Sequence, residues 1–125
     1  MGKKRILLID DEVGLTRLLK LNLEQTGQYE VWTENQGAKG IEAARDFRPD
    51  LILCDIIMPD LEGPEVAAKI QADPLLAKTP LVFMTAVVSR EEVEARGGMI
   101  GGHPFIAKPV TVDKILECIG QHLQG

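Results

Sequence analysis

The chain has 125 residues, which is the length of one domain and enough to bury a hydrophobic core without disulfides or a structural metal. Its 45% hydrophobic and 26% charged residues are typical of globular proteins, and its net charge of -5 argues against direct binding to nucleic acid or an anionic membrane. No apolar run approaches the roughly 18 residues of a membrane span, and no signal peptide is visible. We therefore expect one cytoplasmic domain over residues 1–125, with Cys54 and Cys118 as buried free thiols.

Short apolar runs alternate with helical patterns in the first half of the chain. Residues 5–9 predict a strand, and apolar residues then recur at helical spacing over 13–23. Residues 29–33 alternate weakly, as in an edge strand with one face toward water, and a second helical pattern runs over 41–47. Residues 51–54 are all apolar, which indicates a central parallel strand buried on both faces.

The same alternation continues in the second half. Gly63-Pro64 opens a third helix, because proline suits the first helical position. Residues 81–84 form another fully apolar strand, and a capping-box pattern at 89–92 predicts a fourth helix. A fifth strand is expected at 105–107, and the apolar stripe over 112–123 predicts a last amphipathic helix. Five strand–helix units with right-handed crossovers predict a doubly wound parallel α/β sheet with helices on both faces.

A polar residue of a different kind follows or ends each central strand. Asp10 and Asp11 follow the first strand, Asp55 the third, Thr85 the fourth and Lys108 the fifth. The carboxyl ends of parallel strands share one edge of the sheet, and sites in doubly wound sheets lie there. We therefore expect these five side chains to form one acidic pocket.

The chemistry of this pocket predicts a magnesium ion and a phosphoryl group. Three neighbouring carboxylates repel one another unless a cation joins them, and oxygen ligands without thiolate or imidazole favour Mg²⁺. Asp55 can act as a nucleophile that forms an acyl phosphate. Thr85 offers a hydroxyl, Lys108 a positive charge and Ala86 a backbone N–H, which together suit a transferring phosphoryl group.

These motifs resemble the receiver domain of bacterial two-component response regulators. The resemblance extends from Lys4 to about Leu123, and its set of motifs is highly specific. It rests on four segments, namely residues 6–12, 49–63, 84–86 and 105–109. It implies a flavodoxin-like sheet of five parallel strands in the order 2-1-3-4-5 with five helices on its two faces. It also implies a phosphoprotein that signals through conformational change, not an enzyme.

The resemblance assigns a role to each metal-site residue. It implies that Asp55 is the phosphoacceptor and that a sensor histidine kinase or a histidine phosphotransfer protein is the donor. Asp11, Asp55 and the backbone carbonyl of Ile57 are then the Mg²⁺ ligands, with Asp10 assisting through water.

The remaining site residues are expected to contact the phosphoryl group or to report its presence. The resemblance implies that Thr85, Lys108 and the N–H of Ala86 contact the phosphoryl group, and that Lys108-Pro109 is a cis peptide. Phe105 matches the aromatic switch position, with ordinary core packing as the alternative.

The chain departs from the family pattern in one segment, and a second feature bears on loss of the phosphoryl group. Residues 96–104 are rich in glycine, which weakens a helix, so a typical output through that face is in doubt, and Pro104 suits an edge strand. Ile57 and Val87 flank the pocket and are both apolar. Neither can orient an attacking water, so we expect slow loss of the phosphoryl group.

Several questions stay open at this stage. The chain is either a stand-alone receiver or part of a longer regulator, and its downstream protein target, cognate kinase and possible dimerisation are unspecified. Alternative hypotheses are a receiver-like binding module that is never phosphorylated and a flavodoxin-like cofactor carrier. A third is a phosphatase with Asp10 as nucleophile and Glu12 as acid.

Overall fold

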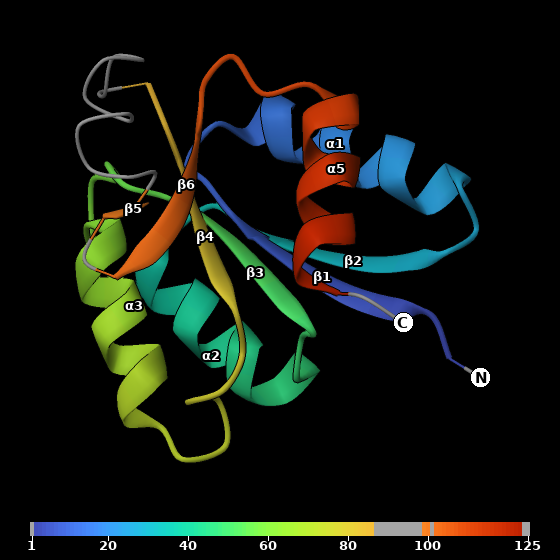
Figure 1. Ribbon diagram of the computed structural model, residues 1–125. Helices are drawn as coiled ribbons and strands as arrows, with labels where there is room; N and C mark the ends of the chain where they lie inside the picture. Colours follow the sequence, from blue (N-terminus) through green and yellow to red (C-terminus); the bar gives the residue numbers. More distant parts are fainter. Residues whose placement is uncertain (1, 87–98, 101, 124–125) are drawn as a thin grey trace.

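The computed structural model describes residues 2–86, 99–100 and 102–123. Its elements, in chain order, are β1 (Lys4–Ile9), α1 (Val13–Gln25), β2 (Tyr29–Glu34), α2 (Gly37–Phe47), β3 (Leu51–Asp55), α3 (Gly63–Ala72), β4 (Leu81–Thr85), β5 (Met99–Ile100), β6 (His103–Ala107) and α5 (Val112–His122) (Figure 1). The described residues contain four helices, and the predicted helix that opens at 89–92 lies outside them. None of these helices is long and apolar enough to cross a membrane.

The sheet confirms the predicted parallel order and adds one strand. The five parallel strands lie in the order β2-β1-β3-β4-β6, which is the predicted 2-1-3-4-5 arrangement. The short β5 pairs antiparallel with β6, through Met99 with Pro104 and Ile100 with His103. The interpretation of Pro104 as a mark of an edge strand was therefore wrong, because β5 lies outside β6. Gly102, with φ of 83°, adopts the left-handed backbone that this tight reversal needs.

Two helical layers cover the sheet, with α2 and α3 on one face and α1 and α5 on the other (Figure 1). Alternate residues of a strand point to opposite faces of the sheet, so one strand contributes side chains to the core on both faces. Leu7 and Ile9 of β1 pack toward α2 and α3, whereas Ile6 and Leu8 pack toward α1 and α5. Both cysteines are free and buried, as predicted. This two-sided core fixes the strands whose carboxyl ends carry the site.

Side chains from α1 protect the outer edge of β2. The N–H of Val31 donates to Glu24 Oε2 at 3.2 Å, and the carbonyl of Val31 accepts from Lys20 Nζ at 2.6 Å. Lys20 and Glu24 also pair with each other at 3.3 Å. The backbone N–H and carbonyl of Val31, at the middle of this edge, therefore have hydrogen-bond partners within the chain. This disfavours pairing of the edge with a strand of another molecule.

Candidate functional site

The structure brings the predicted pocket residues together at the carboxyl edge of the sheet. Asp10 and Asp11 follow β1, Asp55 ends β3, Thr85 ends β4 and Lys108 follows β6. One carboxylate oxygen from each of the three aspartates lies within 4.8 Å of the other two. Asp10 and Asp55 are buried, whereas Asp11 faces solvent. The pocket therefore has two enclosed carboxylates and one at its mouth.

Lys108 is the cation that faces these carboxylates. Its Nζ lies 2.8 Å from Asp10 Oδ2, 2.8 Å from Glu12 Oε1 and 3.5 Å from Asp55 Oδ2. Burial alone would lower the pKa of Lys108, but its contacts with Asp10, Glu12 and Asp55 raise that pKa above the ordinary value. The Lys108–Pro109 peptide bond is cis, as expected, and the Lys108 N–H donates to the carbonyl of Thr85 at 2.8 Å.

The buried carboxylates are held at an energetic cost. Burial raises the pKa of Asp10 above its usual range, although its contact with Lys108 acts in the opposite direction. Burial and the neighbouring Asp10 charge raise the pKa of Asp55 to about 6. One ammonium group therefore does not fully compensate the negative charge of the pocket, and a further cation would relieve the remainder.

The donor set fits a magnesium ion. Asp10 Oδ1 accepts the N–H of Glu12 at 2.9 Å. Asp10 Oδ2 is buried, and its contact with Lys108 is an ion pair without a directed hydrogen bond, so this oxygen has no hydrogen-bond partner among the described residues. Three carboxylates with no nitrogen or sulfur ligand in the cluster form an oxygen-only set, which suits a hard divalent ion.

The loop from β3 to α3 folds back closely onto the end of β3. The N–H of Gly63 donates to the carbonyl of Ile56 at 2.6 Å. A Cβ atom on Gly63 would lie 2.5 Å from the backbone oxygen of Asp55, so this position has no room for any other residue without a shift of the loop. Ile57 lies in this loop with 51% of its surface exposed, and its backbone N–H acts to lower the pKa of Asp55 against the effect of burial. The close turn therefore fixes the backbone at the end of β3, beside Ile57.

The same loop also holds the start of α2. Asp60 accepts the N–H of Gly37 at 2.9 Å and the N–H of Ala38 at 3.0 Å, and these bonds lower the pKa of Asp60. Gln36, the residue at the N-cap position of α2, makes no such side-chain bond. Asp60 is therefore a helix cap supplied from a different loop.

The other predicted residues occupy the expected positions, although their roles stay predictions. Thr85 is fully buried at the end of β4, and Ala86 beside it is exposed. Phe105 is half-buried and packs against the core on the α2 and α3 side. Val87, expected beside Thr85, lies outside the described residues.

Two contacts at the pocket were not predicted. Sequence analysis assigned Glu12 no role toward Lys108, whereas the two form an ion pair at 2.8 Å. Asn35 donates to the carbonyl of Asp10 at 2.7 Å and to the hydroxyl of Thr16 at 3.1 Å, which ties the loop after β1 to the end of β2. Asn35 directly follows β2, so the sequence could have placed it at the carboxyl edge of the sheet together with the other pocket residues.

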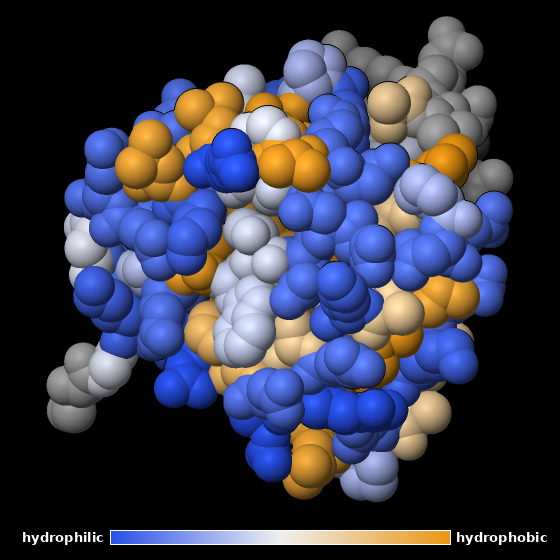
Figure 2. Space-filling model, turned by 180° about the vertical axis from the view of Figure 1, so that it is seen from behind, coloured by the Kyte–Doolittle hydropathy of each residue, from blue (hydrophilic) through white to orange (hydrophobic). Residues whose placement is uncertain are grey.

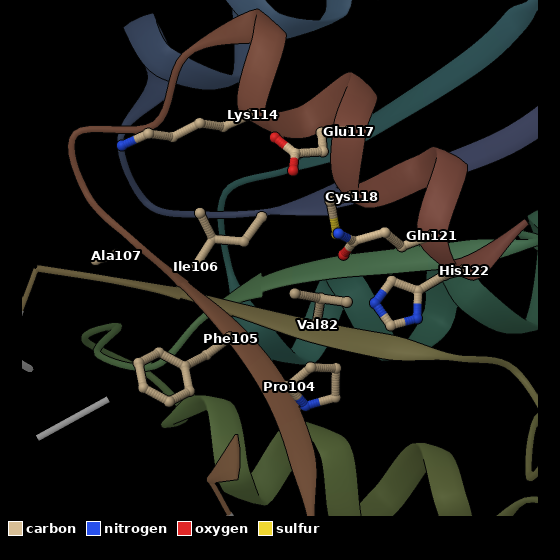
Figure 3. A pocket seen from close by; sticks show the side chains of 10 residues that line it. All are labelled: Val82, Pro104, Phe105, Ile106, Ala107, Lys114, Glu117, Cys118, Gln121 and His122. Atoms are coloured by element: carbon tan, nitrogen blue, oxygen red, sulfur yellow. The ribbon is translucent and has the colours of Figure 1, made fainter. Parts of the chain in front are cut away.

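A separate hollow of about 320 Å³ lies between β6 and α5 (Figure 3). Val82, Lys114 and Cys118 are among its lining residues, and none of the pocket aspartates reaches it. Phe105 and Ile106 point to opposite sides of β6 beside it (Figure 3). Burial raises the pKa of Cys118 to about 11, so its thiol stays protonated and weakly nucleophilic at neutral pH. The hollow therefore offers space without the reactive groups of the carboxylate pocket.

Comparisons with known proteins agree with this geometry. Residues 6–120 match the family model described as the response regulator receiver domain. The DNA-binding dual master transcriptional regulator RpaA of Synechocystis is 32% identical over 112 residues, which are 90% of this chain and 46% of that protein. The polar-differentiation response regulator DivK of Brucella anthropi is 31% identical over 121 residues, which are 96% of each chain. This chain thus spans about half of RpaA and nearly all of DivK.

A solved structure shows the same fold. The chemotaxis protein CheY4 of Vibrio cholerae superposes with a TM-score of 0.84, covering 98% of this chain and 100% of that one at 24% identity. At that identity the likeness establishes the flavodoxin-like architecture and the parallel strand order only.

Proposed function

This chain belongs to the response regulator receiver domain family, the signalling module of two-component systems, and we propose that it acts as a phosphorylation-driven switch with Asp55 as phosphoacceptor. The observation that carries the proposal is the placement of the Asp55 carboxylate. It lies at the buried end of β3, within the cluster of three aspartates, and 3.5 Å from Lys108 Nζ. We further propose that residues 1–125 form a single receiver domain.

Magnesium is the proposed cofactor of this pocket. Asp11, Asp55 and the backbone carbonyl of Ile57 would hold the ion, and Asp10, whose Oδ2 is paired only with the Lys108 ammonium, would assist. When bound, the ion neutralises carboxylate charge and polarises a phosphoryl oxygen. The tight turn at Gly63 supports this assignment, because it fixes the loop that presents the carbonyl of Ile57.

The transfer step follows from the groups around Asp55. A carboxylate oxygen of Asp55 forms a bond to phosphorus while the phosphorus–nitrogen bond of a phosphohistidine donor breaks, and that electron pair returns to the imidazole nitrogen. With a pKa of about 6, Asp55 is mostly ionised at neutral pH. Lys108, the Thr85 hydroxyl and the N–H of Ala86 would neutralise and orient the phosphoryl oxygens.

The donor is proposed to be a histidine kinase or a phosphotransfer protein that docks beside the pocket. Val13, Leu18 and Leu21 of α1 are 46%, 55% and 57% exposed, and Ile57 is exposed at the pocket itself. Figure 2 shows apolar side chains at the surface over α1. Such a patch next to a charged pocket suits a protein partner with an apolar helix face.

The output of the switch is proposed to run through protein contacts. RpaA is by name a DNA-binding regulator of which this chain matches about half, whereas DivK is matched over nearly its full length. A net charge of -5 disfavours direct contact of this domain with nucleic acid. An attached output domain, a separate protein target or a second copy of this chain would therefore respond to the state of Asp55.

Intact mass spectrometry after incubation with acetyl phosphate tests the proposal. We expect one phosphoryl adduct in the wild type with Mg²⁺, and none without Mg²⁺ or in Asp55→Asn. A folded wild type that binds Mg²⁺ but gains no adduct would instead identify a receiver-like binding module that is never phosphorylated. An adduct that persists in Asp55→Asn would assign the phosphoacceptor elsewhere.

A further inference from the structure

Lys108 is closer to a residue outside the metal cluster than to the proposed phosphoacceptor. Its Nζ lies 2.8 Å from both Glu12 Oε1 and Asp10 Oδ2, but 3.5 Å from Asp55 Oδ2. The Lys108 side chain is only 9% exposed, whereas that of Glu12 is 59% exposed. Glu12 therefore draws the ammonium group toward the solvent side of the pocket.

The position of Glu12 makes this contact noteworthy. It occupies the N-cap position of α1, where the side-chain oxygen of Ser, Thr, Asp or Asn commonly accepts an N–H bond from the first helical turn. Its side chain makes no capping bond there. Its backbone is fixed instead, because its N–H donates to Asp10 Oδ1 at 2.9 Å. The carboxylate of Glu12 thus contacts Lys108 and not the first turn of α1.

We propose that Glu12 is a positioning residue that shares the Lys108 ammonium with Asp10 and so draws part of its charge away from the carboxylates that bind Mg²⁺. This inference rests on the proposed function, since it concerns the same pocket. Asp10 and Asp55 are contacted by the Lys108 ammonium and are also members of the proposed metal site. An ammonium group and a divalent ion compete for the same oxygens. By taking one share of the Lys108 charge, Glu12 leaves Asp10 and Asp55 more available to the metal.

A simple charge effect would act in the same direction and must be separated from positioning. Glu12 is negative and close to the site, so it attracts Mg²⁺ whatever Lys108 does. The two explanations differ in a double-mutant cycle. If Glu12 works through Lys108, its removal matters only while Lys108 is present. If it works through its charge alone, its removal matters equally in both backgrounds.

The experiment is a calorimetric titration of Mg²⁺ into the wild type, Glu12→Gln, Lys108→Ala and the double variant. We expect Glu12→Gln to weaken Mg²⁺ binding about three- to tenfold in the wild-type background, and less than about twofold in Lys108→Ala. Glu62→Gln is the matched control, since Glu62 is an exposed acidic residue of the β3–α3 loop. It should change affinity by less than about twofold.

Equal weakening in both backgrounds, or no weakening by Glu12→Gln, would overturn the inference. Thermal unfolding of each variant checks that it folds. If Lys108→Ala does not fold, Lys108→Met takes its place in the cycle. If the wild type itself binds no Mg²⁺, the proposed function fails. If the wild type binds Mg²⁺ and the cycle shows no coupling, only the role of Glu12 fails.

Discussion

Asp55 ends β3 and Asp60 lies in the loop that follows, yet their carboxylates have opposite surroundings. Asp55 is buried beside Asp10, and its pKa is raised to about 6. Asp60 is exposed, accepts two N–H groups at the start of α2, and has a lowered pKa. The folded chain thus disfavours the charge of Asp55 and favours that of Asp60. The same residue type costs stability where it prepares chemistry and contributes stability where it caps a helix.

Gly63 begins α3 at the end of the loop that follows Asp55 and contains Asp60, and its replacement should have the largest effect on stability. Gly63→Ala places a Cβ atom 2.5 Å from the backbone oxygen of Asp55, so the loop must shift. We expect a loss of about 2–3 kcal/mol in the free energy of unfolding, measured by urea denaturation, together with slower phosphorylation by acetyl phosphate.

Gly14→Ala is the control for that substitution. Gly14 lies in α1 with open space around its Cβ position, so alanine should be neutral or slightly stabilising. Similar stability of Gly63→Ala and the wild type would show that the loop tolerates a different path past Asp55.

Removing the charge of Asp55 should stabilise the metal-free protein. Asp55→Asn abolishes a buried charge next to Asp10, so we expect a gain on the order of 2 kcal/mol in unfolding free energy in a chelator at neutral pH. Asp11→Asn, at an exposed member of the same cluster, should change stability by less than about 0.5 kcal/mol. Added Mg²⁺ should stabilise the wild type and narrow its gap to Asp55→Asn. A destabilised Asp55→Asn would mean that the contact with Lys108 outweighs burial.

Removing the carboxylate of Asp60 should have the opposite sign. Asp60→Ala leaves the N–H groups of Gly37 and Ala38 without their acceptor, and we expect a loss of about 1 kcal/mol in unfolding free energy. Glu62→Ala is a suitable control in the same loop, because Glu62 makes no side-chain cap bond to α3. Equal losses in the two variants would assign the effect to the loop in general.

Ile57 lies between these two aspartates and should influence kinetics more than stability. Its exposed apolar side chain cannot orient a water toward a phosphoryl group on Asp55. Ile57→Asn should therefore speed loss of the phosphoryl group about three- to tenfold, followed by intact mass over time. Ile57→Val keeps the side chain apolar and should leave the rate unchanged. An unchanged rate in Ile57→Asn would show that the apolar side chain of Ile57 does not limit loss of the phosphoryl group.

The sequence predicted Asp55 far better than Asp60, for a physical reason. Asp55 ends a fully apolar strand, and parallel topology alone sends such ends to one edge, where Asp10 and Lys108 also arrive. The capping role of Asp60 depends on where its loop meets α2, a contact between residues 22 and 23 positions apart. Sequence patterns for helix caps consider only residues next to the helix, so they do not predict a cap from a distant loop.

Other features that sequence analysis missed share this non-local origin. The ion pair between Glu12 and Lys108 joins residues 96 positions apart, and no spacing rule connects them. The strand β5 has only two residues, too few to show an alternating pattern, and its antiparallel pairing depends on the turn at Gly102. Hydrophobic periodicity in the sequence reveals helices and strands that bury one face. The ion pair and the short strand depend instead on tertiary contacts between elements that are already formed.

The smallest expected effect is the acid dependence of the Asp60 cap. Because the pKa of Asp60 in the folded chain lies below its ordinary value of 3.8, the cap contributes fully at higher pH and is lost as the pH falls through the lowered value. The stability difference between the wild type and Asp60→Asn should therefore be constant from about pH 7 to pH 5 and shrink in more acidic solution. Asp60 is exposed, so this contribution should stay below about 1 kcal/mol. Urea denaturation across this range measures it, and a difference that grows on acidification would contradict the assignment of Asp60 as an ionised cap.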